Sequence, residues 1–494
     1  MYLYLRLILA LLMVQCFQVH AETERNRIRF GIPTAPSSLD PRFSVDAVSA
    51  RLQNLVHRSL VRFEESQMVV PDLAEWEKLA PLHYRFTINE GAYFNNGNKV
   101  VASDVHATYK SILDPEIMSP HIGSLKNIRE IIELDDRTVD FFLNKADHFF
   151  PDSLSIGILP AAYVQNPPSK DIFAASAGPF EVLSWTTNEP LVLRRRKDGH
   201  IFEFIAIKDS NARSLRLISG EIDIMQGDVP PHIYASLLQR PDLYGKRIAG
   251  NTFSYLGFNL RDGITSDPRF RQALAHAINR DAILKFLFQG SARKAWALFP
   301  PSHWAGAENL NGFSYNPTLS REIIAEINPT ATPIILNYKT STNKFRQRVA
   351  NVIQSQLASV GVDMKIEILD FGTLMGEISR GDFQSYSLSW VGLRTSDMYR
   401  QIFHSKSVPP LGKNRGHYKS IRADELIEMA EKESDLHLRR NLYKKLQFLL
   451  LEELPYVPLW FEDHLVVMRK DIQSYTTNID GGYSALIDTQ RSRK

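Results

Sequence analysis

The sequence predicts an α/β protein of more than one domain, on the strength of three observations. The chain has 494 residues, a length that far exceeds what a single hydrophobic core supports. Residues 334–368 contain a strand, a helix and a second strand in close succession. Further segments of alternating apolar and polar residues, typical of half-buried strands, lie at 28–32, 84–88 and 383–390.

The strand–helix–strand unit is the clearest local pattern. Ile334–Leu336 is a short apolar strand, and Gly361 is expected to end the helix that follows it. A strand–helix–strand unit of this length implies that its two strands pair in parallel. One helical face carries Val349, Val352, Ile353, Leu357 and Val360, and the second strand alternates at Val362, Met364, Ile366 and Ile368.

Shorter signals of local structure lie elsewhere in the chain. Leu52–Leu60 has apolar residues at helical spacing, and Asn95–Asn98 is typical of a turn. Ser103 is expected to cap a helix, with Asp104 favouring the positive end of the helix dipole. Pro268 is expected to begin another helix.

Two loops follow predicted strands and are the first candidates for a binding site. One is Pro33–Pro41, which is rich in proline and serine, and the other is Val391–Asp397. In α/β sheets, ligands bind beyond the carboxyl ends of the strands. We therefore expect these loops to contact a ligand.

The N-terminus has the pattern of a secretory signal. Arg6 precedes the apolar run Leu7–Val14, and Ala21 ends a sequence that signal peptidase accepts. We expect residues 1–21 to be removed and the mature chain to be periplasmic. Cys16 is the only cysteine, and the residues before it do not favour lipid anchoring. The mature chain would then have no thiolate chemistry and no cysteine-bound metal.

Charge and motifs argue against several functional classes. The chain has 58 Lys and Arg against 55 Asp and Glu, without the basic stripe that nucleic-acid binding requires. It contains no G-x-S-x-G, H-E-x-x-H or P-loop motif. The 14 histidines are scattered, and one such as His276 is expected to be packed or solvated. We predict no catalytic residue, no metal site, no cofactor and no enzymatic activity.

Short motifs spread over nearly the whole mature chain occur in this order: Ser38–Pro41, Val70–Trp76, Tyr84–Ile88, Phe94–Gly97, Ala102–Val105, Gly178–Phe180, Ser219–Asp223, Tyr255–Asn259 and Asp267–Leu274. Each motif alone is weak, but the ordered series resembles the family 5 solute-binding proteins, the oligopeptide- and dipeptide-binding proteins of ABC importers. Most of the matching residues have structural interpretations, so they indicate the fold more than the ligand.

The resemblance implies an α/β fold of the two-lobed periplasmic binding protein type (class II, cluster C) with an additional early domain. Domain I would comprise residues 22–53, 170–246 and 462–494, domain II residues 54–169, and domain III residues 247–461. The crossings between lobes would act as hinges, and a solute would bind between the lobes.

The implied function is capture of a peptide or peptide-like solute and its delivery, by a monomer, to an ABC permease and ATPase complex. Two alternatives stay open. The protein could present a solute to a membrane receptor as a sensor, or it could be a periplasmic hydrolase whose nucleophile or metal site the sequence does not reveal.

The resemblance also implies residues at the site. Ser38 and Leu39 lie in the first candidate loop, and the remaining expected ligand-binding residues are Tyr255, Phe258, Asn259, Trp390, Arg394 and Asp397. Peptide-binding members carry an Asp that binds the solute's α-amino group three residues after the Trp that aligns with Trp390. This chain has Leu393 there, followed by Arg394.

Three interpretations of this departure stay open. Asp397 takes over the amine, or Arg394 binds an anionic group of a different solute, or Arg394 forms an ordinary ion pair and the solute lies elsewhere. The basic run Lys413–Lys419 is expected to be a solvated surface.

Overall fold

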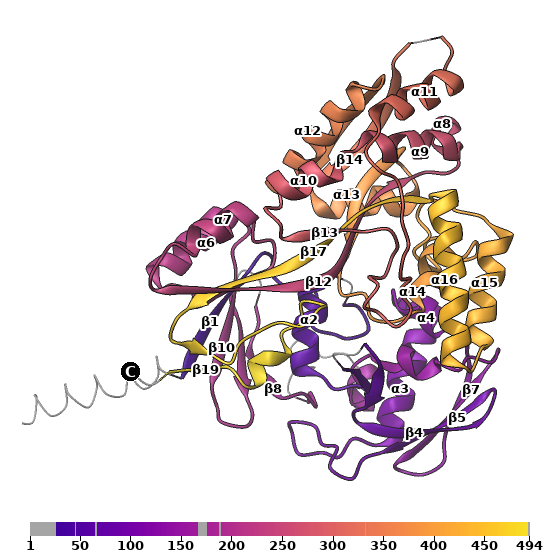
Figure 1. The fold of residues 1–494 in the computed structure, drawn as a ribbon. Helices are drawn as coiled ribbons and strands as arrows, with labels where there is room; N and C mark the ends of the chain where they lie inside the picture. The colour runs from indigo at the N-terminus through magenta and orange to yellow at the C-terminus, as the bar shows by residue number, and fades with distance from the viewer. Residues whose placement is uncertain are drawn as a thin grey trace, which may run out of the picture.

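The computed structural model describes residues 26–44, 46–64, 67–165, 175–186, 189–330 and 332–492. The predicted signal sequence and Cys16 lie outside these ranges. The described chain forms two lobes and an early domain (Figure 1). Among the described residues, no helix is both long enough and apolar enough to cross a membrane.

One sheet of 11 strands runs through both lobes in the described part of the chain. Its order is β15 (Val362–Leu369), β14 (Ile334–Ser341), β16 (Ser385–Trp390), β12 (Leu243–Phe258), β17 (Tyr456–Arg469), β11 (Ile224–Gln226), β1 (Arg27–Ile32), β10 (Ile201–Ala206), β9 (Leu191–Arg195) and β8 (Phe180–Ser184), with β13 (Ala292–Lys294) paired to β17. Strands β14 and β15 pair in parallel, as their strand–helix–strand sequence predicts.

The long strands β12 and β17 connect the lobes. They pair antiparallel over most of their length, with a register shift between Ile248 and Thr252. The start of β12 and the end of β17 lie in the first lobe, and the two strands continue into the second lobe (Figure 1). There β12 also pairs with β16. Gly250 lies in the shift, where a Cβ atom would come within 2.2 Å of the Glu462 carbonyl oxygen. A glycine is needed there because the two backbones approach so closely.

The second lobe packs helices on both faces of its sheet. Alternate residues of β12 serve the two cores, since successive side chains of a strand point to opposite faces: Leu256 and Phe258 pack in one apolar cluster, and Phe253 and Tyr255 in the other. The helices are α8 (Gly263–Ser266), α9 (Pro268–Ala277), α10 (Arg280–Phe286), α11 (Pro317–Ile327), α12 (Lys344–Ala358), α13 (Phe371–Arg380), α14 (Met398–Phe403), α15 (Ile421–Lys432) and α16 (Leu436–Glu453).

The early domain has its own four-stranded sheet, in the order β4 (Ala74–Ala80), β5 (His83–Ile88), β7 (Thr138–Leu143) and β6 (Ile128–Glu133), beside the pair β2 (Val61–Phe63) and β3 (Val69–Pro71). Its helical segments are α3 (Ala102–Leu113), η1 (Pro115–Ile117), α4 (Ile122–Leu125), η2 (Phe150–Leu154) and α5 (Ala161–Gln165). The predicted cap at Ser103 is wrong. Helix α3 begins at Ala102 after Val101, and the Asp104 carboxylate accepts from the Val101 N–H at 2.9 Å.

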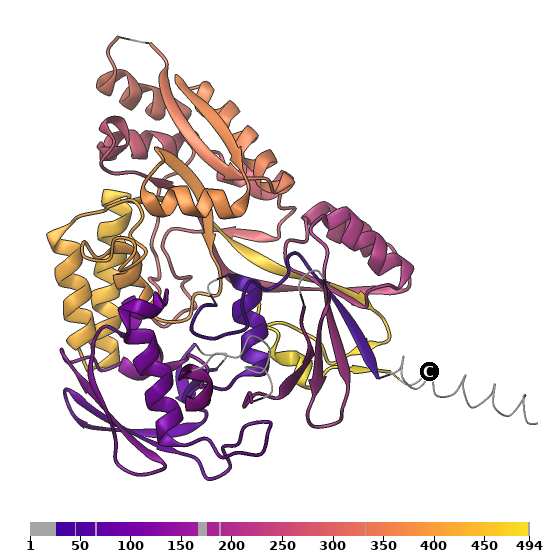
Figure 2. The same ribbon diagram turned by 180° about the vertical axis from the view of Figure 1, so that it is seen from behind.

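The first lobe contains β1, β8–β11, α2 (Ala47–Val56), α6 (Ser210–Ser219) and α7 (Pro231–Leu237). The last segments of the chain, β18 (Ile472–Gln473), η4 (Ser484–Ile487) and β19 (Gln490–Arg491), complete this lobe (Figure 2). Arg491 Nη2 donates to the Arg27 carbonyl oxygen at 3.1 Å, which brings the two ends of the described chain together.

The first lobe and the early domain have separate buried apolar clusters. Leu55 and Val56 pack in the first lobe, whereas Leu60 packs in the early domain. Ala175 and Ala177 also pack in the early domain. The two cores therefore divide between Val56 and Leu60 and between Ala177 and Phe180, and the domain bounds stay a prediction.

Candidate functional site

The loop after β16 crosses from the second lobe to the first. Arg394 forms an ion pair with Asp480 of the first lobe, and its guanidinium carbon lies 5.8 Å from the ring centroid of Phe63 in the early domain. The neighbouring Leu393 carbonyl accepts a hydrogen bond from the Asn251 amide at the strand crossing. The loop therefore contacts all three parts of the fold.

The Arg394–Asp480 pair favours the charged form of Asp480. Burial alone would raise the pKa of Asp480, but Arg394 and the Gly482 N–H, which donates at 2.8 Å, hold that pKa below its usual range. This is the arrangement that the ion-pair alternative describes. Contact between Arg394 and a solute stays a prediction.

Asp397 faces the junction between the second lobe and the early domain. It precedes α14 without capping it. Burial, together with Glu431 of α15 and Asp147 of the early domain, raises the pKa of Asp397 to about 6, against the opposing effect of Lys413. A role for Asp397 in binding an amine stays a prediction as well.

Trp390 and Tyr255 belong to a cluster of aromatic side chains from three adjacent strands. The Tyr255 ring is stacked on Tyr456 at 4.1 Å and on Trp390 at 6.1 Å between centroids, and it meets Tyr386 edge-on at 5.9 Å. The three tyrosine hydroxyls and Trp390 Nε1 are buried. The hydroxyls of Tyr386 and Tyr456 interact with that of Tyr255, which also interacts with Arg415. Sequence reasoning missed Tyr386 and Tyr456, although Tyr386 shares the period-two face of β16 with Trp390.

The basic run after α14 is only partly a solvated surface, which corrects the expectation. Lys419 is exposed, but Lys413 and Arg415 are half-buried. The Arg415 guanidinium carbon lies 4.6 Å from the Trp390 ring centroid and Lys413 Nζ lies 5.8 Å from it. Neither cation has a carboxylate within ion-pair distance among the described residues.

The other expected residues have packing roles in this structure. Leu39 and Phe258 are fully buried in apolar cores, so their side chains offer no surface to a solute. Asn259 donates to the Gly381 and Phe383 carbonyls at 3.2 Å, which occupies its amide. Ser38 Oγ accepts from the Asp40 N–H at 3.0 Å and shapes the first candidate loop.

His121 of the early domain interacts with both the first candidate loop, Pro33–Pro41, and the basic run Lys413–Lys419. Burial and the neighbouring Lys413 lower the pKa of His121 to about 4, while Asp40 acts in the opposite direction. His121 therefore lies within electrostatic range of both Asp40 and Lys413. The two candidate loops contribute to one region, between the lobes and the early domain.

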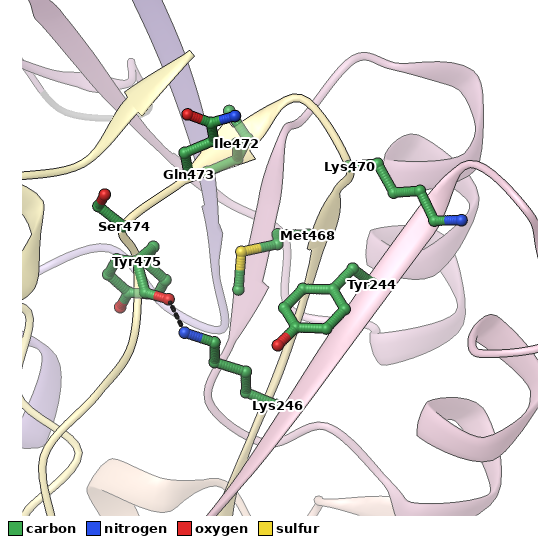
Figure 3. Close-up of a pocket in the computed structure, with 8 residues that line it drawn as sticks. All are labelled: Tyr244, Lys246, Met468, Lys470, Ile472, Gln473, Ser474 and Tyr475. Atoms are coloured by element: carbon green, nitrogen blue, oxygen red, sulfur yellow. Dashed lines mark hydrogen bonds between the residues drawn. The ribbon is translucent and has the colours of Figure 1, made fainter. Parts of the chain in front are cut away.

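A surface hollow of about 450 Å³ lies elsewhere, on the first lobe (Figure 3). Lys246 occupies one side and donates to the Tyr475 carbonyl at 2.9 Å. None of the expected site residues lines it; the lining consists of Tyr244, Lys246, Met468, Lys470, Ile472, Gln473, Ser474 and Tyr475. We place the candidate site at the interlobe region because the loop after β16 and the cations Lys413 and Arg415 beside Trp390 meet there. The described residues contain no group of three or more His, Cys, Asp or Glu side chains able to hold a metal ion.

Known proteins resemble this chain over almost its whole length. The oligopeptide-binding protein AppA of Bacillus subtilis is 25% identical over 482 residues, covering 90% of this chain and 87% of AppA. The glutathione-binding protein GsiB of Escherichia coli K12 is also 25% identical, covering 91% of each chain. The structure of AppA with a nonapeptide matches with a TM-score of 0.85 at 23% identity, covering 94% of this chain and 99% of that one.

A further structure, NikZ of Campylobacter jejuni with Ni(L-His), matches with a TM-score of 0.84 at 22% identity, covering 94% of this chain and 100% of that one. These structural matches confirm the two-lobed α/β fold. The family model of the bacterial extracellular solute-binding proteins, family 5, matches residues 68–408, which is well over half of the 494 residues. The chain belongs to this family of bacterial extracellular solute-binding proteins.

Proposed function

We propose that the protein captures a peptide or peptide-like solute between its lobes and delivers it to the permease and ATPase of an ABC importer. Family membership over residues 68–408 carries the proposal. The names of its relatives support it, since AppA binds oligopeptides and GsiB binds glutathione, which is itself a small peptide. The same fold holds Ni(L-His) in NikZ, so the fold alone does not select the solute.

The capture mechanism rests on the division of the chain into domains. We propose domain I at 22–53, 170–246 and 462–494, domain II at 54–169 and domain III at 247–461. Strands β12 and β17 would be the hinge. A solute that contacts both lobes binds the closed form better than the open form, so it shifts the population toward closure.

The ion pair between the lobes would stabilise the closed form in addition to the solute. Arg394 and Asp480 belong to different lobes, and Asp480 is deeply buried in their ion pair. The permease would then recognise a closed form that solute and ion pair stabilise jointly. The binding role needs no catalytic residue and no cofactor, and we propose that the protein acts in the periplasm as a monomer after removal of residues 1–21.

Thermal unfolding with a panel of di-, tri- and oligopeptides tests the proposal. A bound solute stabilises the folded protein by mass action, by about 2.7 kcal/mol at a concentration of 100 Kd. Native mass spectrometry of freshly purified protein should also detect a co-purified small molecule of peptide mass. A panel of sugars and metal chelates is the control, and stabilisation by one of those with none by any peptide would contradict a peptide-like solute.

A further inference from the structure

The early domain and the second lobe contact each other through a buried arginine. Arg439 of α16 is 2% exposed. Its guanidinium carbon lies 3.5 Å from the ring centroid of Phe149, in the early domain, and 5.4 Å from that of Trp304, in the second lobe. The two rings are themselves stacked, 5.4 Å apart at an interplanar angle of 13°. An aromatic face attracts a cation most strongly where water is excluded, so this contact favours the joined arrangement of the two parts.

The hydrogen bonds of Arg439 come from its own lobe. Its Nη2 atom donates to Ser396 Oγ at 3.0 Å and to the Tyr443 hydroxyl at 3.1 Å. No carboxylate of the described residues lies within ion-pair distance of the guanidinium. The side chain is therefore held in position by the second lobe, and the early domain adds the Phe149 ring to a cation that is already oriented.

The backbones of the two parts also meet. The His148 N–H of the early domain donates to the Glu431 carbonyl of α15 at 3.4 Å. Gly123 of α4 lies so close to the second lobe that a Cβ atom would come within 2.5 Å of the Leu411 carbonyl oxygen. The contact between the early domain and the second lobe is thus a fitted interface with Arg439 inside it.

Carboxylates gather around the arginine from both sides of this interface. Arg439 acts electrostatically on Asp147 and Asp152 of the early domain. From the second lobe, Asp397 acts on Asp152, and Glu431 acts on both Asp147 and Asp397. Joining the two parts therefore brings like charges together, with one guanidinium between them.

This crowding favours protonated carboxyls in the joined arrangement. Burial raises the pKa of Asp147 to about 6 and that of Asp152 to about 7, in each case against the opposing effect of Arg439. The pKa of Asp397 is also about 6. Asp152 is 7% exposed and the other two are half-buried. Because hydrated carboxyls titrate near pH 4, the joined form binds more protons, and this advantage is lost as the pH rises through 6 to 7.

One neighbouring group acts in the opposite direction. Burial, together with Lys78 and Arg439, lowers the pKa of His148, so joining the two parts discharges this imidazole as the pH falls toward 6. Three carboxyls outweigh one imidazole. The other titratable or charged groups that face the network are Tyr84, Lys126, Arg400, Lys413, Glu428 and Glu433.

We propose that Arg439, Phe149 and Trp304, with the carboxyls of Asp147, Asp152 and Asp397 around them, form a proton-sensitive latch that holds the early domain against the second lobe more firmly as the pH falls. The latch rests on the proposed closure of the lobes and adds a dependence on the surrounding pH. Solute capture would become tighter in an acidic medium with no change in the contacts that the solute makes.

A distance between two spin labels tests the latch without any solute. The labels are attached through Glu130→Cys in β6 and Glu425→Cys in α15, both exposed, in the protein without residues 1–21, since Cys16 is the only native cysteine. The ratio of short-distance to long-distance populations is expected to rise by roughly 3- to 10-fold from pH 8 to pH 6. A ratio that does not change with pH would overturn the latch.

Asparagine imitates a protonated aspartate, so the triple variant Asp147→Asn, Asp152→Asn, Asp397→Asn tests the carboxyls. It should have the short-distance population of the acidic native protein already at pH 8, and the rise between pH 8 and pH 6 should disappear. A rise as large as that of the native protein would overturn the role of these three groups.

Arg439→Gln tests the cation itself and should lower the short-distance population at both pH values. Arg440→Gln is the matched control, because Arg440 is the next residue of α16 and pairs with Glu308 at the surface; it should behave as the native protein does. Phe149→Leu removes the aromatic face from the early domain and serves if Arg439→Gln does not fold. An undiminished short-distance population in a folded variant would overturn the latch.

The latch and peptide capture can fail separately. A pH-dependent distance with no stabilisation by any peptide would support the latch and count against capture of a peptide. Stabilisation by a peptide together with a pH-independent distance would overturn the latch and leave capture intact.

Discussion

Replacement of Arg394 by alanine should weaken solute binding without unfolding either lobe. Asp480 is only 6% exposed and Arg394 is 30% exposed in their ion pair. Exposed pairs contribute at most about 1 kcal/mol, and breaking a fully buried pair costs about 3–5 kcal/mol. The intermediate burial of this pair places the cost near 2 kcal/mol, which is roughly a 30-fold change in an equilibrium constant.

That cost falls on the closed arrangement, because the two residues belong to different lobes. Solute affinity should therefore fall by up to roughly 30-fold, since the solute binds a closed form that is less populated. Asp480→Ala should have a similar effect. If the pair acts only as a contact between lobes, the double variant should bind no more weakly than either single variant.

Calorimetric titration of these four proteins forms a double-mutant cycle. The control is Arg380→Ala, which breaks an exposed pair with Asp382 inside the second lobe and should change affinity little. If Arg394→Ala lowers affinity in the Asp480→Ala background by as much as it does in the native protein, the reasoning is refuted, because Arg394 would then bind the solute directly.

Three further perturbations probe the fold. Asp152→Asn should stabilise the protein by up to about 4 kcal/mol at pH 8, because burial raises the pKa of this carboxyl from 3.8 to about 7 and makes its ionisation costly. This gain in stability should shrink as the pH falls through 7 and vanish below pH 4, where the folded and unfolded carboxyls are both protonated. Urea unfolding at pH 8 and pH 4 measures the gain. A gain that does not depend on pH would show that ionisation of Asp152 is not its cause. Glu462→Gln should lower stability by about 2 kcal/mol, because it leaves the guanidinium of Arg346, now paired at 2.5 and 2.8 Å, without its partly buried counter-charge. A loss below about 1 kcal/mol in urea unfolding would count against this. Gly257→Ala should lower the Tm and disturb near-ultraviolet tyrosine ellipticity, because its Cβ atom would lie 2.7 Å from the Tyr386 ring; an unchanged spectrum would show that the ring can move.

Local patterns predicted much of the fold, because they depend on neighbours along the chain. Strands β1, β5, β14, β15 and β16 and the proline-initiated helix α9 lie where apolar periodicity and capping chemistry place them. The exception at Ser103 is instructive. Its neighbour Asp104 reaches back to the Val101 N–H, so a carboxylate at the third helical position replaced the cap that the serine hydroxyl was expected to provide.

The candidate site was harder to predict, since it depends on strand order. Tyr255 and Trp390 were expected there, but Tyr456 joins them only because β12 lies between β16 and β17 in the sheet. No short-range pattern pairs Arg394 with Asp480, which lies in another lobe. Arg415 resembled an ordinary surface cation in the sequence because its burial comes from Trp390, which lies on strand β16 rather than beside it in the chain.

The position of β17 also constrains how the protein is made. This strand begins at Tyr456, close to the end of the 494-residue chain, yet it lies in the middle of the 11-stranded sheet and pairs with β11, β12 and β13. Neither lobe can complete its sheet until the last tenth of the polypeptide has been synthesised. The nascent chain consequently stays incompletely folded for almost its entire synthesis.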